Sequence, residues 1–128
     1  MFSAAAYVFS DRTKATTFST LDSKEIGNAY VAGYYEGLFA RWSVLFFHRD
    51  TNGNWVGYYL AHESGRWNNA KMNTDGEKIF IERDAKRMGT YDLRSKLFTH
   101  GPSGVTFPKE EGLVKEKDLQ QFGLIKNE

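Results

Sequence analysis

The sequence predicts a single α+β domain, residues 1–128, built on one antiparallel meander sheet of four to six strands with a packed helix and a short C-terminal helix. Three observations lead to this fold class. The length of 128 residues fits one domain. Turn signals recur at short spacing through the middle of the chain, between runs rich in aromatic and β-branched residues. Helical spacing of apolar residues occurs on either side of that region.

The best evidence for strands lies in the middle of the chain. Asn52-Gly53 and Asp75-Gly76 tolerate the positive φ of tight hairpin turns, and Ser64-Gly65 is a further turn signal. A hairpin is also expected near the N-terminus, between Ala4–Ser10 and Ala15–Leu21. The predicted meander strands are Arg41–Arg49, Trp55–His62, Arg66–Met72, Glu77–Arg83 and, after a charged link at 84–88, Thr90–His100.

Alternation assigns side chains to the two faces of these strands, because successive residues of a strand point to opposite sides. Within Arg41–Arg49, Val44 and Phe46 share one face, and Leu45 and Phe47 share the other. Both faces are apolar, so we expect both to be covered. The strand at 66–72 is far more polar, which favours an exposed or ligand-facing position.

The segment Ser23–Ala40 is predicted to be a helix packed on the sheet. Ala29, Gly33 and Gly37 recur at every fourth position and would form a smooth face for close packing. The glycines oppose this assignment, since each weakens a helix by about 1 kcal/mol relative to alanine. The alternative is two further strands, which would turn the protein into an all-β barrel.

The C-terminal region predicts a short helix, Val114–Phe122. Gly123 suits the left-handed position after a helix, and Leu124 would then contact Leu119.

Composition narrows the classes of function. Seventeen basic and sixteen acidic residues give a net charge of +1, which does not favour nucleic-acid binding. The absence of cysteine excludes disulfides, thiolate metal sites and a cysteine nucleophile. Nothing resembles a signal peptide or a membrane span, so we expect a cytoplasmic protein without a membrane partner. The spacing of histidines matches no metal motif, and no cofactor is expected.

Aromatic residues make up 16% of the chain and are its most distinctive feature. Most must form the core of a small domain, but a surplus can line a concave sheet face. The first hypothesis is therefore a non-enzymatic module that binds a small planar ligand, nucleotide-like or sugar-like, or a protein partner. The candidate binding residues are Trp42, Trp55, Tyr59, Arg66, Trp67 and Asn68.

The second hypothesis is a small metal-independent hydrolase or endoribonuclease. Histidine titrates near neutral pH and suits general acid–base catalysis, while arginine stabilises developing negative charge. A helix followed by a meander that carries His, Glu and Arg on its strands resembles the layout of small microbial endoribonucleases, although no motif is shared. The candidate catalytic residues are His48, His62, Glu63, His100 and Arg83.

Overall fold

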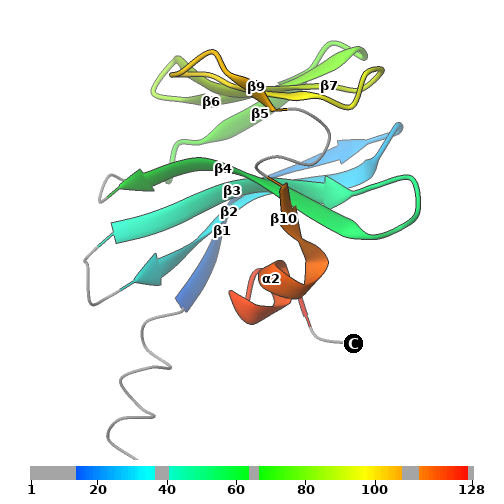
Figure 1. Ribbon diagram of the computed structural model, residues 1–128. Helices are drawn as coiled ribbons and strands as arrows, with labels where there is room; N and C mark the ends of the chain where they lie inside the picture. Colours follow the sequence, from blue (N-terminus) through cyan, green and yellow to red (C-terminus); the bar gives the residue numbers. More distant parts are fainter. Residues whose placement is uncertain (1–13, 37–40, 64–66, 108–112, 127–128) are drawn as a thin grey trace, which may run out of the picture.

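Apolar residues on both faces of the central strands place one sheet in the middle of a layered fold. The computed structural model describes residues 14–36, 41–63, 67–107 and 113–126. One five-stranded antiparallel sheet lies over another, and a short helix covers the far side of the first sheet (Figure 1). The first sheet has the order β1 (Lys14–Ser23), β2 (Gly27–Glu36), β3 (Arg41–Arg49), β4 (Trp55–Glu63) and β10 (Leu113–Lys115). The second has the order β5 (Lys71–Thr74), β6 (Lys78–Arg83), β7 (Lys86–Asp92), β8 (Phe98–His100) and β9 (Thr106–Phe107).

The first sheet is buried on both faces, as its alternation predicted. Val44 and Phe46 of β3 face the second sheet, in a core that includes Ile79, Ile81 and Phe98. We call this side the inner face. The outer face belongs to a second core, made of Ala32, Tyr34, Leu45, Phe47, Val114 and Leu119, and is covered by α2 (Glu116–Gln121).

The predicted helix at Ser23–Ala40 is wrong, because β2 occupies this segment between β1 and β3. Residues 37–40 lie outside the described part of the chain. Both faces of β2 are covered, so apolar residues follow one another without the polar alternation that marks a half-exposed strand. The close approach of β2 to β3 requires glycine at position 33, since a Cβ on Gly33 would lie 2.8 Å from the carbonyl oxygen of Ser43. The barrel alternative is also wrong: neither sheet closes on itself over the described ranges.

The meander does not form a single sheet. The chain crosses from the first sheet to the second between β4 and β5, and β5 begins at Lys71 rather than at Arg66. The predicted charged link at 84–88 is instead a tight turn at Asp84 and Ala85, which have φ of 52° and 63°, and residues 86–88 already belong to β7. The predicted strand Thr90–His100 is divided between β7 and β8. Of the predicted N-terminal hairpin, Ala4–Ser10 lies outside the described residues, and Ala15–Leu21 lies in β1, which pairs with β2.

A bulge in β4 changes which face its last residues occupy. Val44 pairs with Ala61 but the next residue, Leu45, pairs with Tyr59, so Leu60 is the extra residue. Both Leu60 and Ala61 pack into the inner core as a result. His62 is thereby moved to the outer side, where its Nδ1 lies 2.9 Å from the Oγ of Ser43.

The predicted C-terminal helix and its cap are confirmed, although α2 starts two residues later than Val114. Gly123 has a φ of 76°. The N–H of Leu124 donates to the carbonyl of Leu119 at 2.9 Å, and the N–H of Gly123 donates to that of Gln120 at 3.0 Å. This is the Schellman arrangement, and it holds Leu119 fully buried against the sheet. Across the described ranges, no helix is long and apolar enough to cross a membrane.

Candidate functional site

Three aromatic side chains gather on the outer face of the first sheet where α2 does not cover it completely. Tyr30 of β2 pairs in register with Phe47 of β3, and Trp55 stands beside them at the start of β4. Their ring centroids are separated by 5.4 Å (Tyr30–Phe47), 5.7 Å (Tyr30–Trp55) and 5.8 Å (Phe47–Trp55). Such contacts hold the rings in fixed orientations, and the three rings form an apolar wall in which the ring planes are tilted by 24° to 66° to one another.

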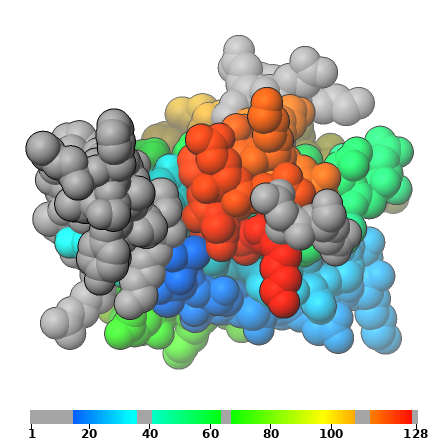
Figure 2. Space-filling view, turned by 90° about the horizontal axis from the view of Figure 1, so that it is seen from below, coloured from blue at the N-terminus to red at the C-terminus, as the bar shows by residue number. Residues whose placement is uncertain are grey.

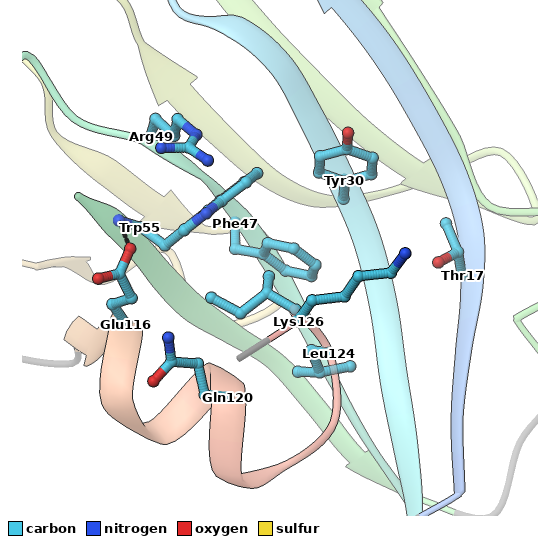
Figure 3. A pocket seen from close by; sticks show the side chains of 10 residues that line it. Thr17, Tyr30, Phe47, Arg49, Trp55, Glu116, Gln120, Leu124 and Lys126 are labelled. Carbon is cyan, nitrogen blue, oxygen red and sulfur yellow. Dashed lines mark hydrogen bonds between the residues drawn. The ribbon is translucent and has the colours of Figure 1, made fainter. Parts of the chain in front are cut away.

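This wall forms one side of a groove, which we call the outer groove. Its volume is about 450 Å³, within the range of small-molecule sites. Figure 3 shows the aromatic side chains on the strands facing α2 and the segment after it. Seen from below, this C-terminal segment lies across the first strands of the sheet (Figure 2). The groove is lined by Thr17, Tyr30, Phe47, Arg49, Trp55, Glu116, Gln120, Leu124, Ile125 and Lys126.

Polar and charged side chains make up half of the residues that line the outer groove. The guanidinium of Arg49 lies 4.7 Å from the Trp55 ring centroid, and its Nη1 donates to the carbonyl of Gly53 at 3.0 Å. The backbone N–H of Trp55 donates to the carboxylate of Glu116 at 3.3 Å, which links α2 to the edge of β4. Arg49 and Lys126 give the lining two cationic side chains against the single carboxylate of Glu116. The groove can therefore stack a planar group and attract a negative one.

Of the predicted binding residues that lie in the described ranges, only Trp55 lines the outer groove. Tyr59 is on the same face but farther along β4, with its hydroxyl 3.5 Å from that of Tyr34. Trp42 is half-buried against Phe18. The remaining three are scattered: Trp67 is 1% exposed in the inner core, Asn68 is exposed, and Arg66 lies outside the described residues.

Sequence reasoning missed most of the groove. Tyr30 was hidden by the helix assigned to its segment, whereas a strand there would have paired it with Phe47 across the β2–β3 hairpin. Arg49 had a usable signal, since it sits at the end of a predicted strand opposite Trp55 in the hairpin register. No sequence signal could have identified Glu116 and Gln120, because only tertiary packing brings α2 to this face.

The three histidines occupy three separate environments. His48 is 1% exposed on the inner face of β3. His62 is exposed on the outer side and pairs opposite Ser43 of β3. Ser43 is five residues from His48 along the strand, which corresponds to about 17 Å at about 3.3 Å per residue. His100 is held by three hydrogen bonds: from Nε2 to the Leu60 carbonyl at 2.8 Å, between Nδ1 and the Ser103 Oγ at 2.8 Å, and from the Ser103 backbone N–H to Nδ1 at 3.3 Å. The arrangement gives no support to acid–base catalysis by two histidines at one substrate.

Glu63 and Arg83 pair with each other. The Arg83 guanidinium forms an ion pair with the Glu63 carboxylate and lies 4.8 Å from the Trp67 ring centroid. The indole N–H of Trp67 donates to the same carboxylate at 3.2 Å. These contacts join the end of β4 to the end of β6 across the buried indole.

Within the described ranges, no three His, Asp or Glu side chains are grouped as metal ligands. Comparison with protein-family models, with curated proteins and with solved structures finds no match to this chain.

Proposed function

We propose that this protein is a binding module that holds a small planar ligand with a negatively charged group in the outer groove. The observation that carries the proposal is the aromatic wall of Tyr30, Phe47 and Trp55 on a sheet face that α2 covers only in part. Tyr30 and Trp55 are half-buried and line the open side of the groove, and contacts with each other and with the buried Phe47 orient their rings.

The charges at the edge favour a nucleotide-like ligand over a sugar-like one. Arg49 and Lys126 are positioned to meet phosphate oxygens, while the rings supply a stacking surface for a base. Gln120 of α2 and the hydroxyl of Thr17 on β1 offer neutral hydrogen-bonding groups across the groove. Neutral sugars would leave the two cations without a partner in the ligand.

Calorimetric titration with AMP, adenosine and ribose tests this proposal. We expect AMP to bind best, adenosine more weakly and ribose least. Trp55→Ala should weaken AMP binding at least about tenfold, the effect of losing roughly 1.4 kcal/mol of stacking. Arg49→Gln should weaken AMP binding more than adenosine binding, because the lost charge faces the phosphate.

Trp42→Phe is the matched control, since Trp42 is a half-buried tryptophan outside the outer groove. It should leave AMP binding unchanged. The proposal would be contradicted if none of the three ligands bound, or if AMP bound equally well to wild type and Trp55→Ala.

A further inference from the structure

A second cavity opens between the two sheets and is separate from the outer groove. Its volume is about 680 Å³. Tyr58 of β4 and Tyr91 of β7 line it together with the apolar side chains of Ile26, Val56 and Leu113. Arg49 is the one lining residue that it shares with the outer groove. We call it the inter-sheet cavity, because strands of both sheets build its walls.

His48 lines this cavity with one ring nitrogen unused. Its Nδ1 lies 2.7 Å from the backbone carbonyl of Arg49, and since a carbonyl only accepts, Nδ1 carries the proton. Its Nε2 has no hydrogen-bond partner among the described residues, although the side chain is only 1% exposed. A buried acceptor without a donor is unfavourable and rare in folded proteins.

The surroundings of His48 keep its imidazole neutral. Burial lowers the pKa of His48, and the hydrogen bond to Arg49 and the charge of Asp50 oppose this only in part. Burial also raises the pKa of Tyr58 to about 12 and raises that of Tyr91, so both phenols are neutral as well. The polar residues Thr51 and Asn52 and five charged side chains also line the cavity, the charged ones being Glu25, Arg49, Asp50, Lys96 and Lys115.

Aromatic rings surround the imidazole on the cavity side. Its centroid is 4.5 Å from that of Tyr91 and 6.3 Å from that of Tyr58. A single water molecule takes up about 30 Å³ and would satisfy Nε2, but it would fill little of a cavity of about 680 Å³. An aromatic molecule with a hydrogen-bond donor would do both. We therefore infer that the inter-sheet cavity binds a small neutral aromatic molecule whose O–H or N–H group donates to Nε2 of His48.

Phenol and toluene form a matched pair of probes, since they are similar in size and only phenol has a donor. The measured quantity is the ratio of the phenol affinity to the toluene affinity, taken from NMR titrations of the full chain. We expect this ratio to be at least about tenfold higher in the wild type than in His48→Phe, which keeps a ring but loses the acceptor. His48→Gln, which keeps a polar group, should recover part of the difference.

Nitrogen NMR of histidine-labelled protein locates the contact. The Nε2 resonance of His48 should shift on addition of phenol and stay unchanged on addition of toluene, while His62 and His100 report no change. His62→Gln is the control variant and should leave the affinity ratio at its wild-type value. The inference would be overturned if phenol did not bind, if the ratio were equal in wild type and His48→Phe, or if phenol left the His48 resonance in place. These outcomes can be told apart from those of AMP binding, because His48 lines only the inter-sheet cavity and Trp55 lines only the outer groove, although Arg49 lines both.

Discussion

The two faces of the first sheet are equally apolar but are covered to different extents. The inner face packs against a whole second sheet, and Val44 and Phe46 are 0% exposed there. The outer face is covered by a helix of six residues and the segment after it, which leave Tyr30 and Trp55 beside open space. The same residue types thus form the closed core on one side and line the outer groove on the other. The difference comes from the extent of the cover and not from the composition of the strands.

Removing the cover of the outer face should produce the largest effect. A chain that ends after Glu111 loses the buried side chains of Val114 and Leu119, at about 1.5–3 kcal/mol each. We expect the free energy of unfolding to fall by about 3–6 kcal/mol, a large part of the 5–15 kcal/mol typical of a domain. Urea unfolding followed by tryptophan fluorescence measures it. A chain that ends at Lys126 is the control, and equal stability of the two would show that α2 does not support the sheet.

Phe46 and Phe47 allow the two faces to be compared at adjacent positions. Phe46→Ala should cost about 3–5 kcal/mol, because the cavity it leaves is closed between the sheets. Phe47→Ala should cost about 1–2 kcal/mol less, since water from the outer groove can enter the vacated space. The same unfolding measurement applies to both. If the two variants lost equal stability, the outer face would be as tightly closed as the inner one.

The smallest of the three effects depends on pH and concerns the inner face. The folded state holds the pKa of His48 below its value of about 6.5 in the unfolded chain. Below about pH 6.5 the unfolded chain therefore binds a proton that the folded chain does not. Stability should then fall by up to about 1.4 kcal/mol per pH unit until the folded pKa is reached.

His48→Phe should remove this contribution while leaving those of the carboxylates in place. Urea unfolding of both proteins at several values between pH 5 and pH 8 gives the comparison. The difference in the free energy of unfolding between wild type and variant should be constant above pH 7. Below pH 7 it should change, because only the wild type loses the His48 contribution. Parallel curves over the whole range would contradict a depressed pKa for His48.

Local patterns in the sequence were sufficient for much of the fold. Alternation in Arg41–Arg49 identified both covered faces correctly, and Gly123 with Leu124 identified the end of α2. Both signals are local, since a strand face or a helix cap depends on a few neighbouring residues. The assignment of strands to two sheets is not local: nothing in residues 64–70 distinguishes a hairpin turn from a crossing between sheets.

The candidate site was harder to predict than the fold, because it depends on which elements meet. Trp55 was identified through its residue type alone. Trp67 has the same residue type and a polar neighbourhood in sequence, yet it is buried and hydrogen-bonded to Glu63. Glu116 contacts Trp55 across 61 positions of sequence, and no periodicity connects them.

The order of strands also has a consequence for the folding pathway. Neighbouring hairpins build β1 to β4, and the whole second sheet follows before the chain returns to pair β10 with β4. Pairings between nearby residues close small loops and form early, whereas the pairing of Leu113 with Tyr58 must close a loop that contains the second sheet. We therefore expect β10 and α2 to dock last, in the rate-limiting closure of the domain. Until β10 and α2 dock, the outer face of the first sheet is an exposed apolar surface. A newly made chain could aggregate through this surface.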